Sequence, residues 1–311
     1  MPRKGLVGSN PTPSEIKMRQ NYPQIICWRI TSKCNRKCSF CFRPESTDLD
    51  TKSVFKIIDK LVKGGVKGIG ITGGEPLLRK DILRILEYIH SKNLKICLAT
   101  NADFYNKYHK QINEYVDAIG IPIEGPTEKI HDAIRGIDNF KNVINVLKTA
   151  YRNNKKIYIS TVVTQKNILD IANIENLLIK YRNRIIYWKL YEFIKYHNKP
   201  FQTIKHTISS KLIRRTIKNI GKKLGRNKTF YLTPKDRSEA SLIINPNGDA
   251  IVPKRRKDKT YDVVLGNVLF DDTKKIFEKW NNLIDYNKYK CHNCALKDGC
   301  IIKNKHHALS L

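Results

Sequence analysis

Segments of strand length alternate with segments of helix length along the first two thirds of this chain, and this alternation restricts its fold most. Ile82, Ile85, Leu86 and Ile89 recur at the i, i+3, i+4, i+7 spacing that gives a helix one apolar face. Strands that alternate with helices predict an α/β fold with parallel strands and right-handed crossovers. We expect strands at 25–31, 66–72, 95–99, 117–123, 156–163 and 185–193, and helices at 52–64, 80–92, 105–115, 139–153 and 169–181.

Three cysteines follow the first of these strands within eight residues, in the stretch Cys34-Asn-Arg-Lys-Cys38-Ser-Phe-Cys41. Three thiolates hold three irons of a cubic 4Fe–4S cluster and leave the fourth iron open to a ligand other than protein. Zinc prefers four ligands, and no His or Cys in this loop completes such a set. A disulfide needs an oxidising compartment, and the chain opens with Met-Pro-Arg-Lys and no apolar signal segment.

The spacing of these cysteines, three residues and then two, with Phe40 before the last, resembles that of the radical S-adenosylmethionine (SAM) superfamily. The resemblance implies that Cys34, Cys38 and Cys41 hold the catalytic cluster and that Phe40 lies beside the cofactor. It also implies that the open iron chelates the amino and carboxylate groups of SAM. Reduction then splits the sulfonium and releases a 5′-deoxyadenosyl radical. The protein has to position this chemistry and shield it from water.

A second motif, Gly73-Gly74-Glu75-Pro76, directly follows the strand at 66–72. Glycines at a strand end let backbone come close to a ligand, and a carboxylate just beyond accepts hydrogen bonds from an ammonium group. A Gly-Gly pair alone is more often only a turn. Its position, one helix-length segment after the cysteine loop, resembles the place where the family binds the amino group of SAM. The resemblance therefore assigns Gly73, Gly74 and Glu75 to that role.

Further SAM contacts are implied by the resemblance at the ends of later strands. These residues are Thr100, Asn101, Glu124, Arg135 and Ser160. The family usually has a serine and an aspartate where this chain has Pro122 and Glu124, so the serine contact is missing while the carboxylate is kept. Arg135 is a candidate partner of the SAM carboxylate, with a helix-surface arginine as the alternative. Ser160 is a candidate for a ribose or carboxylate contact.

Three other residues are expected to have structural roles. Cys27 and Cys97 lie inside apolar strands and are interpreted as buried, inert thiols. His131 is interpreted as a helix-cap residue rather than a catalyst.

The chain length and the position of both motifs agree with a barrel. Ligands of parallel barrels bind beyond the carboxyl ends of the strands, where both motifs lie, and six strands give the open, partial (β/α)6 TIM-like barrel that the resemblance implies. The chain has 311 residues and is 41% hydrophobic, which suffices for one large domain and a smaller appendage.

No apolar run approaches membrane-spanning length, and eight cysteines without a secretory signal indicate a reducing compartment, so we expect a cytoplasmic protein.

Three more cysteines, Cys291, Cys294 and Cys300, lie near the end of the chain. They follow a predicted hairpin at 241–253 around an Asn-Gly turn and a helix near 271–283. This order resembles the SPASM/twitch extension, which houses an auxiliary cluster, although Lys254 stands where that family commonly has a cysteine. Three alternatives stay open: a second 4Fe–4S cluster, an empty site, or zinc. The fourth zinc ligand would be His292, His306 or His307.

We divide the chain into an N-terminal tail (1–24), the radical SAM barrel (25–195), a basic bridging segment (196–235) and a SPASM/twitch-like domain (236–311).

The net charge of the chain is +31, from 59 Lys and Arg against 28 Asp and Glu. Residues 209–228 predict a basic amphipathic helix that docks on one face through Ile213, Ile217, Ile220 and Leu224. This charge indicates an anionic partner, such as a nucleotide, RNA, an acidic peptide or a phospholipid surface. The alternative is a lysine-rich proteome whose lysines only solvate the surface.

The resemblance implies that the reaction begins with hydrogen abstraction from a C–H bond, with an external electron donor such as flavodoxin or ferredoxin. The SPASM-like tail favours maturation of a peptide or protein side chain. One alternative is a viperin-like modification of a nucleotide or RNA, because residues 188–193 resemble that branch. Another is a non-enzymatic iron–sulfur protein that binds or senses.

Overall fold

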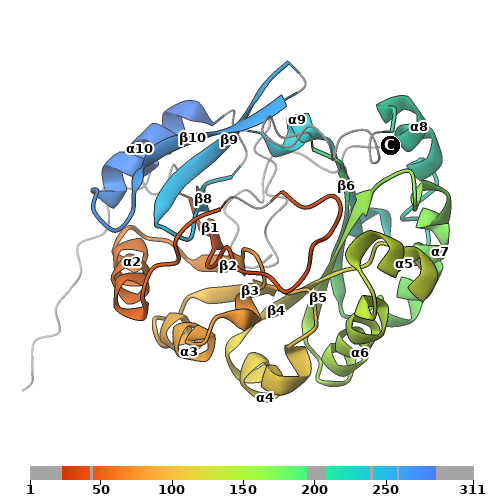
Figure 1. The fold of residues 1–311 in the computed structure, drawn as a ribbon, viewed down its shortest axis with the longest axis horizontal. Helices are drawn as coiled ribbons and strands as arrows, with labels where there is room; N and C mark the ends of the chain where they lie inside the picture. The colour runs from red at the N-terminus through yellow and green to blue at the C-terminus, as the bar shows by residue number, and fades with distance from the viewer. Residues whose placement is uncertain (1–22, 43–44, 195–207, 239–240, 258, 285–311) are drawn as a thin grey trace, which may run out of the picture.

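The structure, a computed structural model, describes residues 23–42, 45–194, 208–238, 241–257 and 259–284. Its described strands form one sheet in the order β10-β9-β8-β1-β2-β3-β4-β5-β6-β7. The bounds are β1 (Ile25–Arg29), β2 (Gly68–Thr72), β3 (Lys95–Ala99), β4 (Ala118–Pro122), β5 (Lys156–Val163), β6 (Ile185–Glu192), β7 (Thr229–Leu232), β8 (Ile243–Ile244), β9 (Asp249–Arg256) and β10 (Lys259–Asn267). The sheet curves around a central space and stays open, as a partial barrel does (Figure 1).

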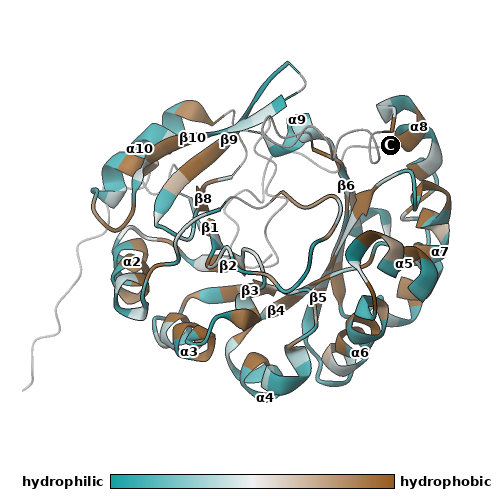
Figure 2. Ribbon diagram, in the orientation of Figure 1, coloured by the Kyte–Doolittle hydropathy of each residue, from teal (hydrophilic) through white to brown (hydrophobic). Residues whose placement is uncertain are grey.

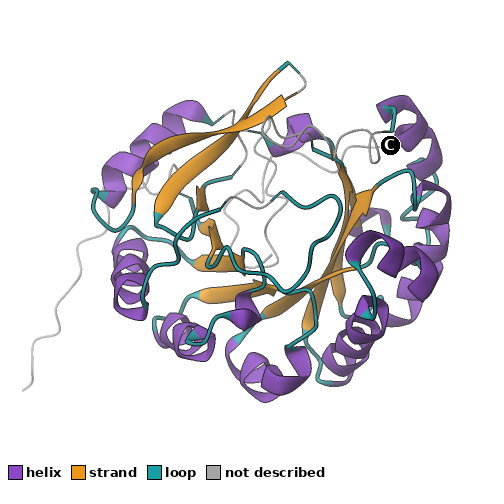
Figure 3. Ribbon diagram, in the orientation of Figure 1, coloured by secondary structure: helices purple, strands orange, loops and turns teal. Residues whose placement is uncertain are grey.

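Most of the described helices lie along the outside of the curved sheet (Figure 3). They are α2 (Thr51–Lys63), α3 (Ile82–Ser91), α4 (Tyr105–Tyr115), α5 (Glu128–Arg135), α6 (Asn139–Arg152), α7 (Ile171–Leu178), α8 (Ser210–Ile217), α9 (Pro234–Arg237) and α10 (Thr273–Leu283). β1 to β6 are parallel, and helices connect each of them to the next. The carboxyl ends of these strands, and the loops that follow them, therefore meet at one end of the barrel.

The helices form where the sequence repeats an apolar face. Ile82, Ile85, Leu86 and Ile89 of α3 are buried against the sheet, as their spacing predicted. The apolar sides of the helices turn toward the strands and their polar sides turn outward (Figure 2). At the start of α2 the Asp50 side chain accepts a hydrogen bond from the backbone N–H of Ser53 and so caps the helix.

The six predicted strands and their helices are confirmed to within a few residues. The predicted helix at 169–181 is split into a 3₁₀ turn (Ile168–Asp170), α7 and a second 3₁₀ turn (Ile179–Tyr181). The hairpin around Asn247 and Gly248 is also confirmed, because β8 and β9 pair antiparallel on either side of it. The sheet is wider than six strands: β7 pairs parallel with β6, and β8 pairs parallel with β1 and leads into β9 and β10.

Residues 209–228 do not form the single long helix that the sequence predicted. The helix α8 ends at Ile217, and a chain of turns leads through Gly221, whose φ is +85°, to β7. A Cβ at Gly221 would lie 2.8 Å from the Thr229 side chain, so the turn needs glycine for both backbone and space. The apolar face itself is confirmed, because Ile213, Ile217, Ile220 and Leu224 are all buried.

The later strands are joined to the barrel by direct contacts. The Lys60 ammonium of α2 donates to the carbonyl oxygens of Val268, Leu269 and Asp271, each at 2.9 Å. The short helix α9 contacts both β7 and β9 and so lies across the opening between the two arms of the sheet (Figure 1). The four-segment division and the cytoplasmic location stay predictions. No helix in the described ranges combines the length and apolar character that crossing a bilayer requires.

Candidate active site

The cysteine loop begins where β1 ends, and its first turn is held by the chain that returns after it. The Thr31 hydroxyl donates to Asp48 Oδ2 at 2.6 Å, and the Ser32 N–H donates to Asp48 Oδ1 at 3.0 Å. The Ser32 hydroxyl donates to the Ser46 carbonyl at 2.7 Å. These hydrogen bonds join the two ends of the loop, so Cys34, Cys38 and Cys41 lie in a loop whose start and end are held together.

The glycine turn after β2 packs directly against this loop. The Gly74 N–H donates to the Thr31 carbonyl, and the Glu75 N–H donates to the Lys33 carbonyl, both at 2.8 Å. A Cβ at Gly74 would lie 1.9 Å from the Lys33 oxygen, and one at Gly73, whose φ is +143°, would lie 2.4 Å from the Thr31 oxygen. Both positions therefore require glycine so that the turn can approach the loop.

The Glu75 carboxylate is fully buried, and both of its oxygens accept hydrogen bonds from protein groups. Oε1 accepts from the Thr100 hydroxyl at 2.7 Å and from the Leu77 N–H at 3.0 Å, and Oε2 accepts from the Asn101 N–H at 2.6 Å. Burial raises the pKa of the Glu75 carboxyl to about 7, against the opposing effect of these three donors. Glu75 thus fixes the end of β3 against the turn after β2.

Asn101 continues this connection to the cysteine loop. Its side-chain amide donates to Asn35 Oδ1 at 2.8 Å and to the Cys34 sulfur at 3.9 Å, and the Arg36 N–H donates to the same sulfur at 3.4 Å. The Arg36 guanidinium forms a two-pronged ion pair with Asp103, with distances of 2.6 and 2.7 Å. The loop is therefore clamped to the chain that follows β3.

Glu124 and Arg135 form a buried ion pair on the other side of the loop. Arg135 Nη1 lies 2.9 Å from Glu124 Oε1, and the Val162 N–H donates to Glu124 Oε2 at 2.7 Å. The Arg135 guanidinium carbon lies 5.5 Å from the centre of the Phe40 ring. The Arg135 backbone oxygen accepts a hydrogen bond from the Cys38 thiol at 3.7 Å. Arg135 Nε is buried without a hydrogen-bond partner in the described chain.

His131 lies within α5 and is fully buried, so its interpretation as a helix cap is wrong. Its Nδ1 accepts from the Glu124 N–H at 3.1 Å, and its Nε2 faces Asn139 Oδ1 at 3.0 Å. Burial lowers the pKa of His131 to about 4, so the ring is neutral. His131 positions the Glu124 backbone, and Asn139 extends this support to the Asn101 carbonyl at 2.7 Å.

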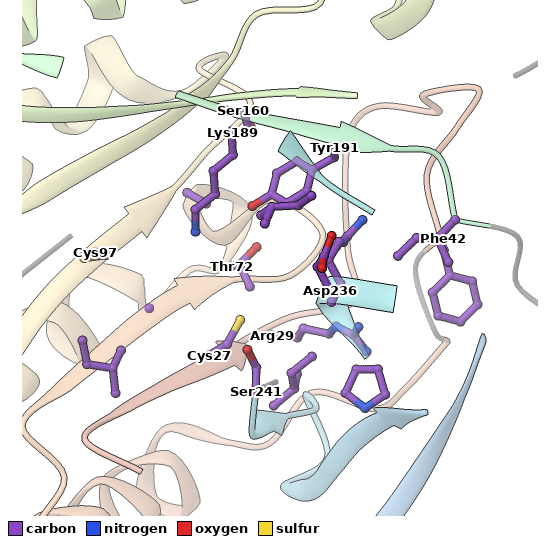
Figure 4. A pocket seen from close by; sticks show the side chains of 18 of the residues that line it. Cys27, Arg29, Phe42, Thr72, Cys97, Ser160, Lys189, Tyr191, Asp236 and Ser241 are labelled. Atoms are coloured by element: carbon purple, nitrogen blue, oxygen red, sulfur yellow. The ribbon is translucent and has the colours of Figure 1, made fainter. Parts of the chain in front are cut away.

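A cavity of about 420 Å³ occupies the centre of the barrel, and Ser160 and Gly73 line it. Cys27 and Cys97 also line it. Cys97 is buried, as the sequence predicted, whereas Cys27 is only half-buried, which corrects its interpretation as a buried thiol. Lys189 and Tyr191 of β6 point into this space toward Cys27, Arg29 and Thr72 (Figure 4). The lumen thus presents polar side chains between apolar ones and reaches the glycine turn at Gly73.

The chemistry of the residues around the cysteine loop is suited to an iron–sulfur cluster and SAM at this end of the barrel. The Cys34 sulfur already accepts from two N–H groups, as the sulfurs of cluster ligands do. Burial raises the pKa of Cys38, while Arg135 acts in the opposite direction and favours the thiolate that binds iron. No group of three His, Cys, Asp or Glu side chains in the described ranges is drawn together as a metal site. Cys291, Cys294 and Cys300 lie outside the described residues.

The structure thus gathers the predicted residues of the first four strand ends around the cysteine loop, whereas Ser160 lies in the lumen. The sequence interpretation missed the residues that support them. Asp48, Arg36, Asp103 and Asn139 are ordinary polar residues in the sequence, and their partners are up to 101 positions away or in a different loop. The only sequence signal was an aspartate two residues beyond the predicted Asn101.

A family model described as the radical SAM superfamily matches residues 28–178 of this chain. The mycofactocin maturase MftC of Mycobacterium tuberculosis is 27% identical over 167 residues, which is 51% of this chain and 42% of that protein. The GTP 3′,8-cyclase of Nautilia profundicola is 25% identical over 229 residues, which is 70% of this chain and 69% of that protein. The match to the maturase thus spans less than half of that protein.

Two solved structures share the fold. SuiB of Streptococcus suis with bound S-adenosylmethionine has a TM-score of 0.66 at 18% identity, covering 89% of this chain and 69% of that one. The enzyme anSMEcpe with bound AdoMet and the Cp18Cys peptide has a TM-score of 0.66 at 16% identity, covering 86% and 84%.

Proposed function

We propose that this chain is an iron–sulfur enzyme of the radical SAM superfamily, whose family model matches residues 28–178, and that it cleaves SAM reductively and abstracts hydrogen from a substrate C–H bond. One observation carries the proposal. The loop with Cys34, Cys38 and Cys41 is bonded to the ends of β2 and β3 through Lys33 and Asn101, and Arg135, which follows β4, packs against it. These are the strand ends at which barrel enzymes hold their ligands.

Each proposed residue then has a specific task. Cys34, Cys38 and Cys41 hold a 4Fe–4S cluster, which, with SAM bound, supplies the electron for cleavage. The side-chain oxygens of Glu75 are engaged by Thr100, Asn101 and Leu77, so the turn offers the SAM amine its backbone carbonyls at Gly73 and Gly74. Glu75 acts by holding that turn in place.

Arg135 and Ser160 complete the proposed cofactor site. The unpaired Nε of the buried Arg135 is suited to a carboxylate, because a buried cationic N–H without an acceptor is costly. The Glu124 carboxylate orients this guanidinium. Ser160 faces the lumen, where its hydroxyl is available to a ribose.

We propose a peptide or protein side chain as the substrate. A maturase is among the relatives, and two structures with the same fold contain a bound peptide, the precursor peptide SuiA in one and the Cp18Cys peptide in the other. A nucleotide is the second candidate, because the match to a GTP 3′,8-cyclase covers 70% of this chain. A flavodoxin or ferredoxin supplies the electron, and Cys291, Cys294 and Cys300 hold a second 4Fe–4S cluster. Membership of an enzyme superfamily does not support the alternative of a non-enzymatic sensor.

The test is SAM cleavage by anaerobically reconstituted protein with dithionite, followed as 5′-deoxyadenosine by liquid chromatography. We expect Cys38→Ala to lose this product to the level of the protein-free blank. Lys37→Ala, which changes an exposed neighbour in the same loop, is the matched control and should keep wild-type production. Product formation by Cys38→Ala at the wild-type rate would show that the cysteine loop is not the cluster site.

A further inference from the structure

The turn end of the hairpin formed by β9 and β10 concentrates positive charge. Residues 254–259, which we call the basic tip, have the sequence Lys-Arg-Arg-Lys-Asp-Lys, with five cations against one acid. The side chains of Arg255, Arg256, Lys257 and Lys259 are all exposed. The hairpin projects past α9 at the top of the view in Figure 1, so these cations are held away from the body of the barrel.

These charges do not stabilise the hairpin that carries them. Arg256 of β9 lies directly opposite Lys259 of β10, and like charges opposite one another destabilise paired strands. Neither side chain forms an ion pair with another described residue, and the Asp262 carboxylate nearer the base lies 3.7 Å from Arg29 instead. Charge on an edge strand discourages pairing between chains whatever its sign, so that role does not require five cations. The basic tip is therefore suited to an anionic partner.

One face of the basic tip continues the wall of the central cavity. Pro253 of β9 and Thr260 of β10 both line this cavity. Arg255 lies opposite Thr260 in the strand register and two residues beyond Pro253, so it shares their face of the hairpin. Arg256 belongs to the opposite face. Arg255 Nε donates to the Lys257 carbonyl at 2.8 Å, which orients the guanidinium, and the strand rises about 7 Å from Pro253 to Arg255.

Resting on the proposed function, we propose that the basic tip binds acidic residues of the peptide substrate, with Arg255 as their first contact. An extended peptide advances by the same distance per residue as a strand. A peptide whose side chain enters the cavity beside Pro253 therefore places the residue two positions away near Arg255 and the residue four positions away near Lys257. Carboxylates at these two positions form charge-assisted hydrogen bonds with the cations.

The test compares two fluorescein-labelled peptides, Glu-Gly-Glu-Gly-Ala-Gly-Glu-Gly-Glu and its counterpart with glutamine at each glutamate. Both carry the variable residues two and four positions from the central alanine, in both chain directions. Binding to the reconstituted enzyme with SAM and without reductant is measured by fluorescence anisotropy at physiological ionic strength. We expect the glutamate peptide to bind about tenfold more tightly, as a few exposed ion pairs together provide.

Two neighbouring arginines provide a matched pair of single variants. Arg255→Gln, on the cavity face, should lower the preference for the glutamate peptide to about threefold, because an ion pair is lost. Arg256→Gln removes the same charge from the opposite face and should keep the tenfold preference. An equal loss in both variants overturns the proposal, because it shows that no contact is made along the cavity face.

Two triple variants separate the basic tip from the overall charge of the chain. Replacement of Arg255, Arg256 and Lys259 by Gln should bring the two affinities to within about twofold of each other, and it removes the like-charged pair without disturbing the hairpin. The control removes three exposed cations of α2 and should keep the full preference; its substitutions are Lys52→Gln, Lys56→Gln and Lys63→Gln. An equal loss in both triple variants shows attraction by bulk charge alone and overturns the proposal.

Three further outcomes are informative. Equal binding of the two peptides by wild type, or binding of neither at the highest soluble concentration, overturns the proposal. Tighter binding of a single-stranded oligouridylate with the same number of negative charges also overturns it and indicates a nucleic-acid site. Absence of 5′-deoxyadenosine production would instead overturn the proposed function, because peptide binding is measured without SAM cleavage.

Discussion

At the scale of single residues, buried polar groups rather than exposed ones define this site. His131 is a neutral ring held between the Glu124 N–H and Asn139, and its pKa is lowered to about 4 by burial. An unfolded histidine titrates at about 6.5, so between these values the unfolded chain binds more protons than the folded chain. His131 therefore stabilises the protein at neutral pH, and this contribution is lost as pH falls through that window.

We predict that wild type loses about 2 kcal/mol of unfolding free energy from this residue between about pH 7 and pH 5. His131→Gln keeps an acceptor for Glu124 and a donor for Asn139 but does not titrate, so its pH dependence should be shallower by that amount. Urea unfolding at both pH values measures the difference. His90→Gln, at an exposed histidine, is the control, and identical slopes for wild type and His131→Gln would contradict the prediction.

The sequence named most of the residues that the structure gathers around the cysteine loop, but it did not reveal what each side chain contacts. Gly73 and Gly74 were expected to allow close approach to a ligand, and the close approach in the structure is to the cysteine loop itself. Glu75 was expected to face an ammonium group, yet its oxygens accept from three protein donors. Motif spacing places a residue at a strand end, but the direction of its side chain depends on neighbours far away in sequence.

At the scale of elements, the cysteine loop depends on the segment after β3. Asp103 accepts from both sides of the Arg36 guanidinium and also from Asn35 and Asn142. Burial raises its pKa, but these hydrogen bonds outweigh burial, and the net effect keeps the pKa below its usual value. The Asp103 carboxylate, which lies just before α4, thus connects the cysteine loop to α6.

We predict that Asp103→Asn weakens this clamp. The neutral amide cannot form the ion pair with Arg36, and its NH2 group would face a neighbouring N–H donor instead of accepting from it. Loss of a partly buried charge-assisted pair costs about 1–3 kcal/mol, so the loop should release its cluster faster. The measurement is the decay of the iron–sulfur absorbance after addition of EDTA under argon, with an expected acceleration of about tenfold. Asp59→Asn breaks an ion pair with Lys92 between α2 and α3 and is the control. Equal decay of both variants would show that the clamp does not hold the cluster.

Elements with a local pattern were predictable, and elements formed by distant pairing were not. The apolar period of α3 and α6 appears within one window of sequence, and both helices lie within two residues of the predicted bounds. The end of α8 at Ile217 depends instead on Gly221 packing against Thr229. The pairing of β8 with β1 joins Ile243 to Cys27, more than two hundred residues apart, which periodicity does not reveal.

At the scale of the whole molecule, the chain after β7 is attached to the barrel at several places. β8 extends the sheet beside β1, α9 crosses the opening, and Lys60 of α2 donates to three carbonyls ahead of α10. The last described residues are therefore anchored to the strand that leads into the cysteine loop.

We predict that replacing Cys34, Cys38 and Cys41 together by alanine leaves about four irons and four sulfides per chain, because we propose that the C-terminal cysteines hold an independent cluster. Wild type should then contain about eight irons, and a variant that lacks all six cysteines should contain none. Iron, sulfide and zinc are quantified on anaerobically reconstituted protein, with Mössbauer spectra to identify the cluster type. Zinc in place of iron in the first variant would identify a zinc site. Neither metal would mean that these cysteines bind none, and the second cluster would be abandoned.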